Sequence, residues 1–316
     1  MSGMSSTVDV LPTVLLTLHG KDETATIGQT YDFVNRLNTY LKNQSINYIK
    51  VINLGFSQTG LMDYKWTSFR SMSQQSGQLC RQIHKPQIWQ QLMNTTLSRR
   101  IVLVGFSQGG LLWRGMLWGQ CLDPLLPRLD RLITFGSPHS GVFILNNCQQ
   151  MMTLSMAKPL AKLCQTMLEI VSLDTTTTNR TVIKRRLPPR GSLSDLFVYN
   201  KLAEQSWPVA SYWNDPLSSR QPLTWLAQID NQINQMDGRL LPATVANKYL
   251  SNKLSRGLAL IAFGAENIVY PPVSSQFGYW DGWARNWLTF NKTKLYTDDW
   301  IGLKQLDLNG LPLITK

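Results

Sequence analysis

The sequence contains few histidines, few cysteines and no long hydrophobic run. Its 316 residues include three histidines and four cysteines, and charged residues make up 16% of the chain. The best apolar stretches, 10–18 and 257–265, are about half the ~20 residues that a membrane-spanning helix needs. The N-terminus carries no Lys or Arg before Lys21 and no small-residue cleavage site, so the sequence predicts neither a membrane span nor a cleaved signal peptide.

The composition is that of a globular protein with a basic surface. Hydrophobic residues make up 43% of the chain, aromatic residues 10%, and the mean hydropathy is -0.15, which excludes a disordered or fibrous chain. The 31 Lys and Arg residues exceed the 19 Asp and Glu residues, which gives a net charge of +12. No stripe or RNA-binding signature organises the positive residues, so we predict no nucleic-acid partner.

One cluster of positive residues stands apart from the rest. It consists of Lys184, Arg185, Arg186 and Arg190. This basic cluster is the candidate for peripheral contact with an anionic membrane, and the alternative is a solvated surface.

The cysteines favour disulfides over a metal site. They are Cys80, Cys121, Cys148 and Cys164. They include no C-x-x-C pair, and no histidine lies between the last two, so we predict no zinc site and no other metal. Four N-x-[ST] sequons agree with a protein of the secretory route. The sequons begin at Asn43, Asn94, Asn179 and Asn291.

Short β-branched and apolar runs alternate with helical patterns along the chain. The predicted strands are 13–18, 46–53, 100–106, 131–136 and 258–264, and the predicted helices are 28–41, 74–92 and 111–117. This alternation is typical of a doubly wound α/β sheet. More than 100 residues that lack this alternation precede the last predicted strand. We therefore interpret 142–256 as an insertion, an expected lid, within a single domain that spans 1–316.

A G-x-S-x-G motif lies between the strand 100–106 and the helix 111–117. Its serine is Ser107, and this position predicts a nucleophile elbow. Glycines are needed around the serine because a Cβ there would collide with neighbouring backbone. The alternative is a glycine-rich turn that merely carries a hydroxyl. A near-copy at 55–60 has Thr59 in place of the second glycine, and we do not expect Ser57 to be catalytic.

A catalytic serine also needs oxyanion donors, an acid and a base. The backbone N–H groups of Gln108 and Lys21 fit the donors by position, and Glu266 follows the strand where the acid is expected. A surface carboxylate is the alternative for Glu266. The base should be a histidine after the acid, but all three histidines precede it; they are His19, His84 and His139. We expect His19 to brace its loop and His139 to be structural.

Six motifs in order, from about Leu11 to the last residue, resemble the palmitoyl-protein thioesterase family. They are GFSQGG at 105–110, HSGVF at 139–143, ASYWNDP at 210–216, NIVYP at 267–271, FGY at 277–279 and LYTDDWIGLK at 295–304. The resemblance implies a lysosomal α/β-hydrolase with a mostly parallel sheet and an inserted helical lid. The implied reaction is removal of long-chain fatty acyl groups, mainly palmitate, from S-palmitoylated proteins or peptides, with no cofactor.

The resemblance also implies roles for individual residues. Ser107 matches the family nucleophile, and Glu266 falls on the family's aspartate. The implied disulfides are Cys80 with Cys121 and Cys148 with Cys164. The Thr-rich and basic stretch 175–191 departs from the family pattern and resembles an insertion in the lid.

The end of the chain leaves alternatives open for the last elements of the fold and for the function. In the family the catalytic histidine follows the last strand, and we expect that strand and the helix after it to be missing from a sequence that stops at Lys316. A lipid esterase of the same fold is one alternative function, and an inactive acyl-binding relative is another. Apolar residues at spacings of three and four in the insertion are read either as an acyl groove or as ordinary core. These are Met152, Met156, Leu160, Leu163 and Met167.

Overall fold

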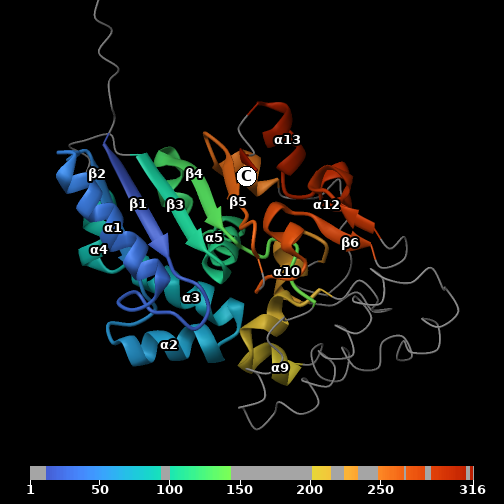
Figure 1. Ribbon diagram of the computed structural model, residues 1–316, viewed down its shortest axis with the longest axis horizontal. Coiled ribbons are helices and arrows are strands. Elements are labelled where there is room, and N and C mark those ends of the chain that lie inside the picture. The colour runs from blue at the N-terminus through green and yellow to red at the C-terminus, as the bar shows by residue number, and fades with distance from the viewer. Residues whose placement is uncertain are drawn as a thin grey trace, which may run out of the picture.

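The computed structural model describes residues 12–93, 100–143, 201–214, 224–233, 248–266, 268–281, 286–310 and 314–315. Its centre is a six-stranded parallel sheet with the strand order β2-β1-β3-β4-β5-β8 (Figure 1). The strands are β1 (Thr13–Leu18), β2 (Ile49–Leu54), β3 (Arg100–Phe106), β4 (Leu129–Phe135), β5 (Leu258–Ile261) and β8 (Ile314–Thr315). A small antiparallel pair consists of β6 (Tyr279–Asp281) and β7 (Asn286–Leu288).

The inner strands are apolar because the sheet is covered on both faces. In β3 the four consecutive residues Ile101, Val102, Leu103 and Val104 are all buried. Such a continuous apolar run, rather than an alternating one, is typical of a parallel sheet between two layers of helices. The predicted mostly parallel α/β fold is therefore confirmed.

The helices follow the strands in the expected doubly wound order. They are α1 (Gln29–Asn43), α2 (Gly60–Phe69), α3 (Met72–Ile83), α4 (Pro86–Met93), α5 (Gln108–Trp118), α9 (Lys201–Ser206), α10 (Trp225–Ile229), α11 (Tyr249–Lys253), α12 (Lys294–Thr297) and α13 (Leu303–Leu308). Short 3₁₀ helices are η1 (Asp123–Arg128), η3 (Pro208–Tyr212), η5 (Pro272–Gln276) and η6 (Phe290–Lys292). Right-handed crossovers from β1 to β2 and from β3 to β4 run in opposite directions along the sheet, so α1 and α5 cover opposite faces.

The strand register brings the loops of the candidate site together. Leu18 at the end of β1 pairs with Leu54 of β2 on one side and with Gly105 of β3 on the other. Parallel strands direct their carboxyl ends to one edge of the sheet. The loop that begins at His19 therefore lies beside the turn that holds Ser107.

One predicted helix needs correction, and one helix was not predicted. The predicted helix 74–92 is two helices, α3 and α4, because Pro86 lacks a backbone N–H and can only begin a new helix. The sequence pattern did not predict α2, whose buried face is polar. The other predicted strands and helices agree with the structure to within a few residues, and β3 agrees at both ends.

β4 and β5 are neighbours in the sheet although residues 136–257 separate them in sequence. Ile133 of β4 pairs in parallel with Ala259 of β5. The structure describes α9, α10, α11 and η3 from the predicted lid, 142–256. The cysteines Cys148 and Cys164, the basic cluster, the stretch 175–191 and the apolar residues 152–167 lie outside the described residues. The role of the insertion as a lid stays a prediction.

The expectation that the last strand is missing needs correction. Ile314 and Thr315 form β8, which pairs in parallel with Ala259 and Leu260 of β5. The last strand is therefore present, as two residues at the edge of the sheet beside β5. Among the helices that the structure describes, none combines the length and apolar character that crossing a membrane requires.

Candidate active site

Ser107 lies in a strained turn between β3 and α5. Its backbone has φ of 48° and ψ of -122°, a positive φ that is costly for a residue other than glycine. The Ser107 N–H donates to the carbonyl oxygen of Phe135 at 2.8 Å, which fixes the turn to the end of β4. The turn therefore has the sharp strand-to-helix geometry of a nucleophile elbow.

The glycines around Ser107 allow close backbone approach. A Cβ added at Gly105 would lie 2.4 Å from the Cα of Gly110, and one at Gly109 would lie 2.5 Å from the carbonyl oxygen of Leu18. Both distances are far shorter than any tolerated contact. The glycine positions of the motif are therefore required by packing between the turn, α5 and the end of β1.

The loop after β1 lies against the serine. A Cβ added at Gly20 would be 3.1 Å from the Cβ of Ser107 and 3.8 Å from its Oγ. Within the described residues, neither the Lys21 N–H nor the Gln108 N–H donates to a protein acceptor. Both N–H groups are therefore free of protein acceptors among the described residues, and their role as oxyanion donors stays a prediction.

The side chain of Gln108 is buried and held at both ends. Its Nε2 donates to Oε1 of Gln75 at 2.9 Å and to the carbonyl oxygen of Thr67 at 3.3 Å, while its Oε1 accepts from the Tyr212 hydroxyl at 3.1 Å. Burial, with a smaller effect of Asp22, raises the pKa of Tyr212, so the hydroxyl stays a donor. These contacts fix the first residue of α5 and thereby the direction of its N–H.

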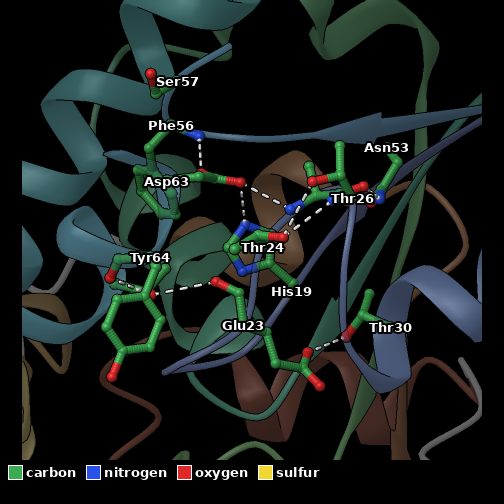
Figure 2. Close-up of polar contacts among 12 residues, drawn as sticks. His19, Glu23, Thr24, Thr26, Thr30, Asn53, Phe56, Ser57, Asp63 and Tyr64 are labelled. Atoms are coloured by element: carbon green, nitrogen blue, oxygen red, sulfur yellow. Dashed lines mark hydrogen bonds and ion pairs between the residues drawn. The ribbon is translucent and has the colours of Figure 1, made fainter. Parts of the chain in front are cut away.

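Asp63 of α2 connects the loop after β1 to the loop after β2 (Figure 2). Its carboxylate accepts from the N–H of Phe56 at 2.6 Å and from the N–H of Ala25 at 2.7 Å, and it lies 3.3 Å from Nε2 of His19. The other ring nitrogen of His19 lies 3.1 Å from the carbonyl oxygen of Gly20. His19 therefore braces the loop, as expected.

Glu266 lies at the same edge of the sheet, after β5. One carboxylate oxygen accepts from the N–H groups of Ile268 at 2.7 Å and Val269 at 2.9 Å. The other oxygen would lie 3.3 Å from a Cβ at Gly136, the residue that follows β4. Because the Ser107 turn is bonded to the end of β4, Glu266 and Ser107 flank the end of the same strand.

His139 has a buried, structural environment. Its Nε2 lies 2.9 Å from Oγ1 of Thr134, and its ring stacks on Phe277 with centroids 4.6 Å apart. Burial, and to a smaller extent the charge of Arg114, holds the pKa of His139 well below its usual value. A neutral, enclosed ring agrees with the expected structural role.

None of the three histidines hydrogen-bonds to Ser107 within the described part of the chain. His19 is paired with Asp63. His84 is exposed, and its Nδ1 lies 2.8 Å from the carbonyl oxygen of Cys80. The base that a serine hydrolase needs is therefore not supplied by these positions.

Arg114 of α5 connects this helix to α10 and α11. The guanidinium is fully buried, forms an ion pair with Asp230, and donates to the Tyr249 hydroxyl at 3.0 Å and to the carbonyl oxygen of His139 at 2.7 Å. Burial raises the pKa of Asp230 to about 6, although the positive charge of Arg114 acts in the opposite direction. This buried network fixes α10 and α11 to the helix that follows Ser107.

The described residues contain one group of three potential metal ligands. Cys80, His84 and Cys121 place a ligand atom each within 4.8 Å of one another. Cys80 and Cys121 are joined in a disulfide, one of the two pairings that the resemblance implies, so neither sulfur is a free thiolate. The group is a disulfide beside a histidine and not a set of available ligands.

The near-copy of the motif lacks the strained turn. Ser57 also lies between a strand, β2, and a helix, α2, but it is not among the described residues with positive φ. Its hydroxyl points away from His19 in Figure 2 and, among the described residues, accepts from the N–H of Thr59 at 3.5 Å. This geometry agrees with the expectation that Ser57 is not catalytic.

A parallel sheet whose central strand enters a helix through a strained serine turn is an α/β-hydrolase fold. A family model described as palmitoyl protein thioesterase matches residues 13–312. The chain belongs to the palmitoyl protein thioesterase family, and the predicted family is confirmed.

Comparison with individual proteins gives shorter or more distant matches. Palmitoyl-protein thioesterase 1 of Caenorhabditis elegans is 33% identical over 123 residues, which cover 37% of this chain and 38% of that protein. Phospholipase PlaB from Legionella pneumophila matches with a TM-score of 0.35 and 11% identity over 70% of this chain and 35% of that chain. The RedJ thioesterase from Streptomyces coelicolor matches with a TM-score of 0.30 and 18% identity over 56% of each chain.

Proposed function

We propose that this protein hydrolyses long-chain fatty acyl thioesters on the cysteines of S-palmitoylated proteins or peptides, through an acyl intermediate on Ser107. A thioester or ester hydrolase follows from the family; the substrate and the serine mechanism are the proposal. The observation that carries it is the strained Ser107 turn, with the loop of Gly20 against its side chain. Glu266, at the same edge of the sheet, is the proposed acid.

The proposed reaction follows from these positions. The Ser107 oxygen attacks the thioester carbonyl carbon while its proton passes to a general base, and the N–H groups of Lys21 and Gln108 hold the oxyanion. The carbon–sulfur bond then breaks, and the cysteine thiol, with a pKa of ~8.5, needs little help from a general acid. Water hydrolyses the acyl-serine. An apolar groove favours long chains because burying each CH₂ contributes ~0.8 kcal/mol.

The base is proposed from the family resemblance. In this fold the histidine follows the acid in the chain, and in the family it follows the last strand. β8 lies beside β5, so the carboxyl end of β8 is directed to the edge where Glu266 lies. We propose that Glu266 orients the base at this edge, although none of the three histidines hydrogen-bonds to Ser107 in the described part of the chain.

Covalent labelling tests the proposal. The full-length protein is treated with a fluorophosphonate probe, which phosphonylates activated serines. We expect labelling of the wild type, no labelling of Ser107→Ala and unchanged labelling of Ser57→Ala, which is the matched control in the near-copy at 55–60. Labelling that survives in Ser107→Ala, or an unlabelled wild type, would contradict the serine mechanism.

The two alternative functions give different outcomes in the same preparation. A lipid esterase prefers oxyesters over thioesters of equal chain length, whereas the proposed enzyme prefers the thioesters. An inactive acyl-binding relative binds a fatty acid but hydrolyses neither ester. The family and the thiol leaving group favour the thioesterase.

We also propose a lysosomal location and glycosylation, as the family resemblance implies. The Cys80–Cys121 disulfide fits an oxidising compartment on the secretory route. Asn43 and Asn291 are exposed, as glycosylation acceptors must be; the sequons at Asn94 and Asn179 lie outside the described residues.

A further inference from the structure

α2 is polar on the side that it buries. Its buried residues are Asp63, Thr67 and Ser68. A surface helix of a globular protein normally buries an apolar stripe and exposes polar residues. α2 has the reverse arrangement.

The inner polar residues hold the loop after β1. Besides the Asp63 bonds to both loops, the Ser68 hydroxyl donates to Oδ1 of Asp22 at 2.6 Å, and the Thr67 hydroxyl lies 3.3 Å from the carbonyl oxygen of Glu23. These hydrogen bonds explain why polar residues face inward. They do not explain the outer face.

The outer face of α2 carries large apolar side chains. Leu61 is 68% exposed and Phe69 is 45% exposed, and Met62 and Tyr64 are exposed beside them. The rings of Tyr64 and Phe69 are in contact, with centroids 6.3 Å apart. Ile27, 71% exposed, is in the loop that packs against the start of α2. We call these five residues the α2 surface.

The charged residues that α2 and its C-cap expose are positive, and the nearby Asp22, which accepts from Ser68, is paired with Lys21. Lys65 and Arg70 are exposed, and neither forms an ion pair with a carboxylate among the described residues. The helix's one carboxylate, on Asp63, is buried. The Arg70 guanidinium lies 5.7 Å from the ring centre of Trp66, so it stays beside the apolar residues. Exposed apolar residues interspersed with Lys and Arg are typical of helices that lie in the interface of an anionic bilayer.

The α2 surface lies close to the candidate active site. The carbonyl oxygen of Thr67 accepts from the side chain of Gln108, the residue after Ser107. Figure 1 shows α2 beyond the arrowheads of β1 and β3, the edge where Ser107 lies. A bilayer in contact with α2 would therefore be next to the site.

We propose that the α2 surface docks on an anionic lipid bilayer and presents the site to acyl groups held at that bilayer. The choice of substrate rests on the proposed function, but the docking does not. A second copy of the chain fits less well, because a two-fold contact would bring Lys65 and Arg70 against the same unpaired positive charges. A bilayer that contains phosphatidylserine supplies the opposite charge.

Vesicle sedimentation tests the docking without any catalysis. We expect the full-length protein to bind vesicles of phosphatidylcholine with one-fifth phosphatidylserine more tightly than vesicles of phosphatidylcholine alone. Leu61→Ser with Phe69→Ser should weaken binding to both vesicles by roughly tenfold or more, because two apolar side chains no longer enter the bilayer. Lys65→Glu with Arg70→Glu should weaken binding to the anionic vesicles by a similar factor.

Control variants are available on the opposite side of the molecule. Leu308 of α13 is 74% exposed, and Lys292 of η6 is exposed; α13 and α2 lie at opposite ends of the view in Figure 1. Leu308→Ser with Lys292→Glu should bind vesicles like the wild type. Equal binding by the α2 variants and the wild type would overturn the proposal. So would a dimer in solution that the α2 variants dissociate.

An activity measurement separates docking from chemistry. The α2 variants should hydrolyse a soluble short-chain thioester at the wild-type rate and a vesicle-anchored palmitoyl peptide at a reduced rate. If the wild type hydrolyses neither substrate, the proposed function is wrong while the sedimentation result still decides the docking. An equal loss on both substrates would instead indicate damage to the site and contradict docking as the role of α2.

Discussion

At the scale of single residues, Asp63 determines the shape of the candidate site as much as Ser107 does. Ser107 supplies the hydroxyl, but the loop that carries the Lys21 N–H is held by the Asp63 carboxylate through Ala25 and His19. The Asp63 side chain is buried, and its polar contacts among the described residues are with the two loops and not with Ser107. It is therefore a positioning residue.

Replacing Asp63 tests this role. Asp63→Asn removes the charge and one acceptor while keeping the shape, so the loop should lose its fixed position. We expect kcat for a soluble thioester to fall roughly 10- to 100-fold with KM little changed, because oxyanion stabilisation is lost from the transition state. The free energy of unfolding should fall by about 1–3 kcal/mol.

The exposed Asp32 of α1 provides the control, and Asp32→Asn should leave kcat and stability unchanged. A purely structural role for Asp63 would lower stability without lowering kcat of the folded enzyme. Rates measured well below the melting temperature distinguish these outcomes.

The sequence predicted the residues of the site that follow a local pattern. Ser107 and Gln108 belong to one motif, and Glu266 follows a recognisable strand. The sequence did not predict Gln75 and Tyr212, which bond to the Gln108 side chain from separate helices. It also did not predict Asp63, which bonds to the loops after β1 and β2. Their contacts depend on tertiary packing, and no spacing in the chain encodes them.

At the scale of elements, the Arg114 network joins α5, α10 and α11 through buried charge. Asp230 is the titrating group. Its pKa in the fold is about 6 against an ordinary value of 3.8. Because the fold favours the protonated form, the contribution of this group to stability is present below about pH 3.8 and is lost as pH rises through about 6.

Comparison with Asp230→Asn, which stays neutral, isolates this titration. The free energy of unfolding of the wild type, minus that of the variant, should decrease between about pH 4 and pH 6.5, by at most about 3 kcal/mol. Urea unfolding at several pH values measures it, and other titrating groups cancel in the difference. A difference that rises with pH would show that the pairing with Arg114 outweighs burial.

Strands and helices were predictable from the sequence where one physical factor determined their residue pattern. Strands with apolar residues on both faces, such as β3, stand out by composition alone. α2 was missed because helix prediction assumes an apolar inner face, and this helix has a polar one. The division of 74–92 depended on the single residue Pro86.

At the scale of the whole molecule, the Cys80–Cys121 disulfide connects α3 to the turn after α5, across 41 residues. Closing a loop of this length in the unfolded chain contributes up to about 4 kcal/mol. Cys80→Ser with Cys121→Ser should lower the free energy of unfolding by roughly 2–4 kcal/mol in urea titrations. His84→Ala, which keeps the bond, is the control and should have a small effect. Unchanged stability in the double variant would mean that packing of α3 already fixes this region.

The adjacency of β4 and β5 has a consequence for synthesis of the chain. The ribosome delivers β4 about 120 residues before β5, which corresponds to roughly 6–24 s at about 5–20 residues per second. During that time the nascent chain exposes an unpaired β4 edge, a site where other chains can pair. The distance along the chain between two neighbouring strands thus leaves one edge of the growing sheet unpaired while the protein is being made.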